Sequence, residues 1–214
     1  MEGLKVKNIN CMRGNNTVFS GLSFNILPGR VLLLSGENGS GKSSFLRIVA
    51  GLLTPSSGVV LWKDRDISLD IDAHHRRSIF IGHANPLKSI MTVRENLEFW
   101  TKLNNIKIDI NISLKKFDLN KQADLPTRYL SAGQCRRLVL ARLAINNQLV
   151  QRPPIWILDE PAAGVDPSAT KTLADLVIEH LNNYGLAIIA SHGGNLDDAL
   201  AVYADRLEIV RDLS

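Results

Sequence analysis

Short apolar runs recur along the chain and alternate with segments in which apolar residues are spaced three or four apart. Runs of this length and composition are typical of strands buried on both faces of a sheet. They are "VLLL" at 31–34, "SIFIGH" at 78–83, "IWIL" at 155–158 and "LAIIA" at 186–190. Because helical segments lie between them, the pattern predicts a parallel sheet covered by helices.

The N-terminal part of the chain has a different pattern, in which apolar and polar residues alternate. This alternation predicts strands at 4–11 and 18–27, with a turn at Pro28-Gly29, and the apolar run "VVLW" at 59–62 predicts another strand. From about 85 to 130 the chain has helical stretches such as "VRENLEFWTKL" and a middle rich in lysine and asparagine. The expected organisation is one domain, 1–214, with a small helical subdomain at about 85–130.

The loop "GENGSGKSS" joins the strand at 31–34 to a predicted helix whose apolar face is Phe45, Ile48, Val49 and Leu52. Glycines permit unusual backbone angles, so successive N–H groups can converge on a phosphate at the helix N-terminus. Lys42 then reaches the β- and γ-phosphates, and the Ser43 hydroxyl is a magnesium ligand. An ordinary glycine turn is the alternative, which the flanking strand and helix disfavour. The candidate nucleotide-binding residues here are Gly36, Glu37, Asn38, Gly39, Ser40, Gly41, Lys42, Ser43 and Ser44.

Two carboxylates, Asp159 and Glu160, end the apolar strand "IWIL". Ligands of parallel sheets bind at the carboxyl ends of the strands, so these acids are expected beside the phosphate loop. Asp159 suits the water shell of magnesium, and Glu160 suits polarising a water that attacks the γ-phosphate. A solvated acidic pair that starts a loop before Pro161 is the alternative interpretation.

A second helix start, "LSAGQCRRLVLARLAI", has Ser131 as its expected N-cap and Gly133 where backbone N–H groups can approach an anion. By pattern alone, Arg136, Arg137 and Arg142 would be a solvated helix face. His192 follows the strand at 186–190, at the expected ligand edge of the sheet, although a lone histidine is more often structural.

Composition narrows the class of protein without choosing a function. The net charge of +4 fits an anionic ligand, a nucleic acid or a membrane surface. The two cysteines form no metal or disulfide pattern, which favours a reducing compartment. We expect neither a signal peptide nor a transmembrane segment, because the N-terminus lacks an apolar core and no apolar run approaches about 20 residues.

Taken in order, "GENGSGKSS", "LSAGQ", "IWILDEP", "AAGVD" and "SH" resemble the ATP-binding cassette ATPases over nearly the whole chain. The resemblance implies an α/β P-loop NTPase with a mostly parallel sheet, an N-terminal antiparallel β subdomain and a small helical subdomain. It implies hydrolysis of ATP with Mg²⁺, with Glu160 and His192 catalytic and with Ser43 and Asp159 at the metal. It also implies an ATP-dependent head-to-tail homodimer. There the signature residues Ser131, Ala132, Gly133 and Gln134, with Asp166 of the D-loop, lie at the partner's nucleotide.

Two positions depart from the cassette pattern. Arg13 stands where an aromatic residue usually stacks on adenine, and its guanidinium is the candidate for that contact. His83 stands where a glutamine usually links magnesium to the membrane partner, which makes it a candidate metal contact.

Longer stretches, such as "IGHANPLKS" and "LSAGQCRRLVLARL", are similar to the ATP-binding subunits of cytochrome c maturation complexes, also called heme exporter ATPases. This likeness implies a peripheral subunit on the cytoplasmic face of the bacterial inner membrane. There it would bind integral membrane subunits and supply ATP hydrolysis for heme handling. The alternative is a soluble cassette ATPase that acts on ribosomes or nucleic acid, but we expect no nucleic-acid partner, because this chain has one cassette and no long insertion.

The stretch 83–103 contains an apolar cluster of Pro86, Leu87, Ile90 and Met91. We expect this cluster at the surface as the contact for a membrane subunit. The alternative is that these side chains pack beneath the helix "VRENLEFW".

Overall fold

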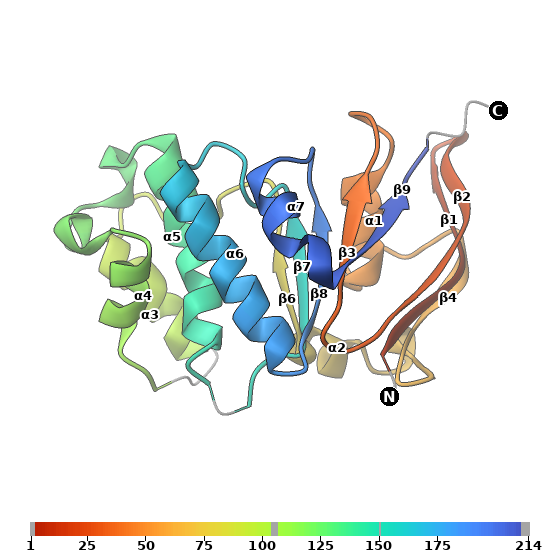
Figure 1. Cartoon of the computed structure of the whole chain (residues 1–214), viewed down its shortest axis with the longest axis horizontal. Coiled ribbons are helices and arrows are strands. Elements are labelled where there is room, and N and C mark those ends of the chain that lie inside the picture. The colour runs from red at the N-terminus through yellow and green to blue at the C-terminus, as the bar shows by residue number, and fades with distance from the viewer. Residues whose placement is uncertain (1–2, 104–106, 150, 211–214) are drawn as a thin grey trace.

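The computed structural model describes residues 3–103, 107–149 and 151–210. An antiparallel sheet, a parallel sheet and a group of helices follow one another from right to left in Figure 1. This arrangement confirms the predicted α/β class with its N-terminal antiparallel part.

The antiparallel sheet contains β1 (Leu4–Arg13), β2 (Asn16–Ile26), β4 (Ser57–Trp62) and the short β5 (Arg65–Asp66), in the order β2-β1-β4-β5. The central strand β1 pairs with both neighbours, so that Leu4 lies opposite Ile26 on one side and Trp62 on the other. Its alternating side chains are buried, as the alternation in the sequence predicts.

The parallel sheet consists of β3 (Val31–Ser35), β6 (Ser78–Ile81), β7 (Ile155–Asp159), β8 (Leu186–Ala190) and β9 (Ala204–Glu208), in the order β6-β7-β8-β3-β9. Because all the pairs are parallel, the carboxyl ends of the strands share one edge. The strand expected at 78–83 ends at Ile81, so His83 lies in the loop two residues beyond it.

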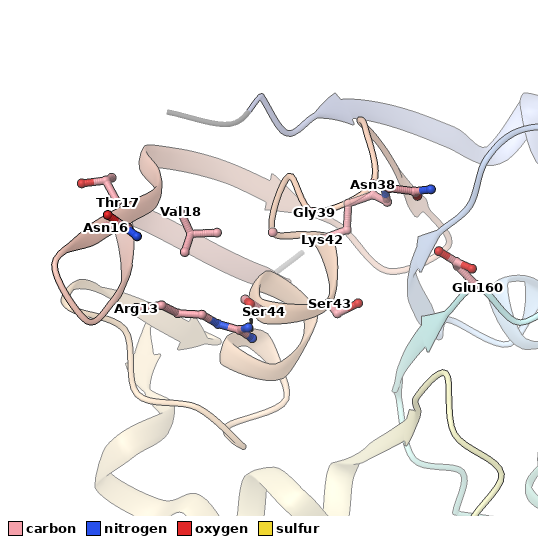
Figure 2. Close-up of a pocket in the computed structure, with 11 residues that line it drawn as sticks. Arg13, Asn16, Thr17, Val18, Asn38, Gly39, Lys42, Ser43, Ser44 and Glu160 are labelled. Atoms are coloured by element: carbon pink, nitrogen blue, oxygen red, sulfur yellow. Dashed lines mark hydrogen bonds between the residues drawn. The ribbon is translucent and has the colours of Figure 1, made fainter. Parts of the chain in front are cut away.

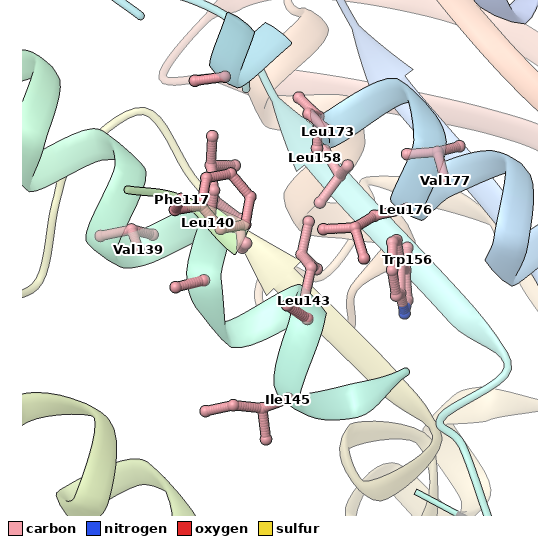
Figure 3. Packing of buried hydrophobic residues seen from close by; sticks show 14 of the residues in the cluster. Phe117, Val139, Leu140, Leu143, Ile145, Trp156, Leu158, Leu173, Leu176 and Val177 are labelled. Atoms are coloured by element: carbon pink, nitrogen blue, oxygen red, sulfur yellow. The ribbon is translucent and has the colours of Figure 1, made fainter. Parts of the chain in front are cut away.

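Side chains of β7 alternate between two cores. Ile155 and Ile157 pack with α1 (Lys42–Val49) and the antiparallel sheet, whereas Trp156 and Leu158 pack with the helices on the opposite face. These helices are α5 (Ala132–Asn146) and α6 (Pro167–Asn182), whose apolar side chains meet β7 in Figure 3. The chain continues through α7 (Asn195–Leu200) and η4 (Ala201–Tyr203) into β9.

The segment between β6 and α5 is helical where the structure describes it. It contains α3 (Val93–Leu103), α4 (Ile110–Lys116), η2 (Asn120–Gln122) and η3 (Thr127–Tyr129). Before β6 in the chain, η1 (Ile67–Asp70) and α2 (Ile71–Arg77) connect β5 to β6. The buried amide of Asn96 donates to the carbonyls of Lys88, Met91 and Thr92, and so holds the turn that leads into α3.

One predicted helix face is partly wrong. Phe45, Ile48 and Val49 are buried on α1, but the helix ends at Val49 and the chain turns at Gly51, which has φ +72°. Leu52 therefore lies past the helix and is 53% exposed. Helical spacing in the sequence does not reveal this, because the turn depends on the backbone angle of Gly51.

Candidate functional site

The phosphate loop lies between β3 and α1, as the sequence predicts. Gly41 has φ +105° and is the N-cap of α1. A Cβ atom there would lie 2.6 Å from the Cγ1 atom of Val18 and 2.8 Å from the Phe19 ring. Only glycine therefore permits both the backbone angle and the close approach of the loop to β2.

Lys42, the first residue of α1, is curled inside this loop. Its ammonium group donates to the carbonyls of Gly36 at 2.6 Å and Glu37 at 3.0 Å, and the residue is 6% exposed. Ser40 carries a buried hydroxyl without a hydrogen-bond partner in the described chain. The loop thus presents a cation and an unpaired polar group in its interior, which suits an anionic ligand.

A cavity of about 400 Å³ lies against the loop. Figure 2 shows Asn38, Gly39, Lys42, Ser43 and Ser44 on one wall, the β1–β2 hairpin on a second and Glu160 opposite them. The hairpin residues Asn16, Thr17 and Val18 were not predicted to line the cavity, because alternation in a strand does not show which turn contacts a ligand. Of the predicted nucleotide contacts, Gly41 also lines the cavity, whereas Gly36, Glu37 and Ser40 form the loop behind it.

Arg13 also lines this cavity, from the end of β1. Its Nη2 atom donates to the hydroxyl of Ser44 at 3.0 Å. This contact places a planar cation at the end of the cavity away from Glu160, where Figure 2 shows it beneath the hairpin.

Glu160 follows β7 with a left-handed backbone, φ +46°, and its N–H donates to the carbonyl of Ala190. One carboxylate oxygen lies 3.0 Å from Nε2 of His192, and the other lies 3.8 Å from Nδ1 of His83. The structure therefore brings both predicted histidines to one carboxylate. His83 is the more exposed, with 76% of its side chain accessible.

Asp159, the last residue of β7, is 3% exposed. The fit for magnesium rests on the donor set: a buried carboxylate at Asp159 and the Ser43 hydroxyl facing the cavity are the hard oxygen donors that this ion takes together with phosphates. No group of three His, Cys, Asp or Glu side chains that could hold a metal occurs within 3–103, 107–149 and 151–210. Such a site would thus be completed by the nucleotide and water.

The signature segment begins α5. Ser131 is its N-cap, accepting from the Gln134 N–H at 3.2 Å, and the Gln134 side chain accepts from the Ser131 N–H at 2.9 Å. This capping box fixes the start of α5 and confirms Ser131 as its N-cap. Ser131, Ala132, Gly133 and Gln134 are absent from the lining of the cavity at the phosphate loop.

Asp166, in the D-loop position, is the N-cap of α6. Its carboxylate accepts from the Ala169 N–H at 3.0 Å, and that hydrogen bond, ahead of the nearby charge of Arg137, lowers the pKa of Asp166. Arg137 Nε lies 3.8 Å from this carboxylate, so the residue joins the signature helix to the start of α6.

The interpretation of three solvated arginines on α5 is wrong for Arg136. This residue is 4% exposed, and its guanidinium donates to carbonyls at the ends of both β6 and β7. Burial lowers the pKa of Arg136, although the charges of Asp159 and Glu160 act in the opposite direction. The sequence did contain a signal, since apolar residues surround the α5 axis and leave no consistently polar face.

A glycine-bordered loop at a helix N-terminus, a lysine inside it and an acidic pair at the end of β7 define a P-loop nucleotide-binding domain. The model of the family described as ABC transporter matches residues 19–163. The cytochrome c biogenesis ATP-binding export protein CcmA of Paramagnetospirillum magneticum is 37% identical over 213 residues, which is 97% of this chain and 96% of that protein. The protein of the same name from Rhodospirillum rubrum is 40% identical over 183 residues, 85% of this chain and 76% of that protein.

Solved structures agree in fold. An ATP-binding subunit of an ABC transporter has a TM-score of 0.82 at 20% identity, covering 97% of this chain and 85% of its own. The cbiO1 protein of Clostridium perfringens, part of the ABC transporter complex cbiONQ, has a TM-score of 0.73 at 28% identity. The match covers 98% of this chain and 85% of cbiO1. The chain belongs to the ABC transporter family of ATP-binding proteins, and it is an ATPase subunit of that kind.

Proposed function

We propose that this chain is the ATP-hydrolysing subunit of an ABC-type membrane complex that handles or exports heme during c-type cytochrome maturation. The observation that carries the proposal is the placement of Lys42, Ser43 and Glu160 around one cavity in a chain that matches a cytochrome c biogenesis protein over nearly its whole length. We also propose that 1–214 is one domain with a helical subdomain at about 85–130. The curated relatives give no support to a ribosomal or nucleic-acid role.

In the proposed reaction, Lys42 exchanges its two loop carbonyls for the β- and γ-phosphates of ATP. Ser43 and Asp159 would hold magnesium, which when bound neutralises charge on the phosphates. Glu160 orients the attacking water and takes up its proton, and His192 holds the Glu160 carboxylate through the 3.0 Å contact. Arg13 stacks on the adenine, and His83 borders the second oxygen of Glu160.

The signature residues act across an ATP-dependent homodimer in this proposal. Ser131, Ala132, Gly133 and Gln134 lie away from the chain's own cavity, so they are available to close the cavity of a second copy. Asp166 and Arg137 link the signature helix to α6 and would lie in the same interface.

The membrane subunit docks, we propose, in a groove of about 830 Å³ that we call the α2–α3 groove. Its apolar lining includes Leu52, Phe80, Trp100 and Leu103, and its basic lining includes Arg76, Lys107 and Arg142. The guanidinium of Arg142 lies 3.3 Å from the centre of the Trp100 ring, and burial lowers the pKa of Arg142 to about 10. An amphipathic helix of a membrane subunit with acidic residues on one side would match this combination.

The apolar cluster at 86–91 supports docking less than the sequence indicated. Ile90 is 78% exposed, but Leu87 is partly buried against the main core. The difference arises because the turn before α3 folds back on itself, held by Asn96. Leu87 therefore agrees with the alternative interpretation, in which side chains of this cluster pack inward.

Loss of the phosphate-loop lysine tests the proposed function in cells. In a bacterium that depends on this chain for cytochrome c maturation, Lys42→Ala should reduce holo-cytochrome c to the level without the protein, because the loop loses its cation. Heme staining of membrane c-type cytochromes measures the effect, with Lys121→Ala, an exposed lysine of η2, as the matched control. Normal cytochrome c levels in Lys42→Ala would contradict the proposal. Within the described residues, no helix is long and apolar enough to cross a bilayer.

A further inference from the structure

The Arg136 side chain donates to six acceptors from two separate loops. After β7, Nε donates to the carbonyl of Pro161 at 3.2 Å, and Nη2 donates to those of Asp159 and Glu160, both at 2.9 Å. After β6, Nη1 donates to the carbonyls of Gly82 at 2.8 Å and His83 at 3.5 Å, and to Oδ1 of Asn85 at 3.3 Å.

This arrangement is unusual for a buried cation. Five of the six acceptors are backbone carbonyls and the sixth is the side-chain amide oxygen of Asn85. Among the described residues no carboxylate accepts a hydrogen bond from the guanidinium, although Asp159 and Glu160 lie close enough to favour its charge. The planar fork of arginine carries five N–H groups in a fixed geometry, so one side chain can hold carbonyls from both loops in one plane. Lysine has three donors on a flexible stem and cannot reproduce that geometry.

The hydrogen bonds from Arg136 to the loop after β7 act directly on Glu160. Its N–H is held by the carbonyl of Ala190 and its carbonyl by Arg136, so both peptide groups next to its Cα atom are fixed. The left-handed backbone, φ +46°, is a conformation that non-glycine residues keep only where the surroundings impose it. Fixing it determines the direction in which the carboxylate leaves the backbone.

The hydrogen bonds from Arg136 to the loop after β6 act on His83, whose ring lies 3.8 Å from the same Glu160 carboxylate. Arg136 therefore controls both sides of this contact from a helix that begins at the signature residues. We infer that Arg136 is a positioning residue for ATP hydrolysis, which sets Glu160 and the loop of His83 relative to each other and to the signature helix. The inference rests on the proposed catalytic role of Glu160.

Steady-state hydrolysis of MgATP by the purified full chain tests this inference. Arg136→Gln should lower kcat by about 10- to 100-fold, since a displacement of about 1 Å in a reacting group can cost about 100-fold. Affinity for ATP, measured by titration with a fluorescent ATP analogue, should stay within about threefold, because Arg136 does not line the cavity at the phosphate loop. Arg136→Lys should recover part of the lost kcat, because it keeps the charge and some of the donors.

The matched control is Arg152→Gln. Arg152 also donates to a backbone carbonyl, that of Leu149 at 3.2 Å, and to Glu179 at 3.3 Å, but it lies away from the nucleotide cavity. This variant should keep kcat even where its thermal stability falls. An equal loss of kcat and ATP affinity in Arg136→Gln, or an unchanged kcat, would overturn the inference.

If Arg136→Gln does not fold, Arg136→Lys decides alone, and wild-type kcat in that variant also overturns the inference. Failure of the proposed function gives a different result. In that case Glu160→Gln hydrolyses ATP like the wild type, whatever Arg136 does.

Discussion

At the scale of single residues, Glu160 is fixed from four directions. Its N–H and carbonyl are hydrogen bonded to Ala190 and Arg136, and its carboxylate lies between His192 and His83. A left-handed backbone at a residue other than glycine costs about 1–3 kcal/mol, which the surrounding contacts must supply. Such fixation suits a group that must hold one water in one orientation.

The proposed role of Glu160 predicts a separation of binding from turnover. Glu160→Gln keeps the size and the backbone preferences of the side chain but removes its ability to accept a proton. Turnover should therefore fall by about 100-fold or more, while ATP affinity stays within a few-fold. Phosphate release and equilibrium binding of ATP measure the two quantities. The variant should also elute as an ATP-bound dimer on gel filtration.

Glu98→Gln is the control for loss of one negative charge, because Glu98 lies on α3 and is partly exposed. It should hydrolyse ATP at the wild-type rate. Rapid turnover in Glu160→Gln would leave Glu160 as a charge at a loop start, which was the alternative interpretation of the sequence.

The residue scale also separates what the sequence could reveal from what it could not. Lys42, Ser43 and Asp159 were predictable because each lies within a short pattern whose local structure follows from neighbouring residues. The absence of a consistently polar face on α5 could indicate that Arg136 is buried. Its hydrogen-bond partners could not be predicted, because they lie in loops 23 and 54 positions away in the chain.

At the scale of elements, α6 packs on the parallel sheet through an aromatic stack. The ring of His180 lies parallel to that of Trp156 on β7, with 4.1 Å between centroids and 8° between planes. Nε2 of His180 lies 3.2 Å from the carbonyl of Leu186 at the start of β8. Gly185 has no room for a side chain, since a Cβ atom would lie 2.3 Å from the His180 ring. The histidine therefore joins the helix to two strands.

This contact predicts a loss of stability in mild acid. Burial lowers the pKa of His180 to about 4, so the unfolded chain, with an ordinary pKa near 6.5, binds the proton first. Stability from this group is complete above about pH 6.5 and falls as the pH drops toward 4, by about 3 kcal/mol at the lower end. Thermal unfolding measured from pH 7.5 to 4.5 should show the decline.

His180→Phe keeps a flat ring beside Trp156 but cannot be protonated. It should weaken the pH dependence between 6.5 and 4.5, even though loss of the contact with Leu186 lowers stability at pH 7.5. Burial also lowers the pKa of His74, so part of the slope should remain. A full slope in His180→Phe would place the acid sensitivity elsewhere.

Element boundaries show the same division between local and tertiary information. The start of α5 was predictable, because Ser131 and Gln134 form a capping box from adjacent residues. The end of α1 was not, because the apolar spacing continues to Leu52 although the helix stops at Val49. The left-handed angle at Gly51 takes Leu52 out of the core and toward the α2–α3 groove.

At the scale of the whole molecule, the nucleotide cavity and the α2–α3 groove are joined by β6. Phe80, near the end of this strand, lines the groove, and the loop that follows carries His83 to Glu160. A membrane subunit in the groove would therefore contact the strand whose next loop borders Glu160, the proposed catalytic carboxylate. This route was not predictable from sequence, because the groove is assembled from segments between Ala50 and Pro153.

The groove gives the sharpest test of the membrane partner. Leu52→Asp places a charge at a 53% exposed position, so the fold and ATP binding by the isolated chain should be preserved. Burial of a leucine at an interface contributes about 1.5–3 kcal/mol, so affinity for the membrane subunits should fall at least about tenfold. Co-purification from detergent-solubilised membranes measures this loss.

Val202→Asp, at an 85% exposed position on η4, is the control and should co-purify normally. Retention of Leu52→Asp on membranes would instead favour the exposed Ile90 and the turn before α3 as the docking surface. Loss of ATP binding in Leu52→Asp would mean that this leucine supports the fold.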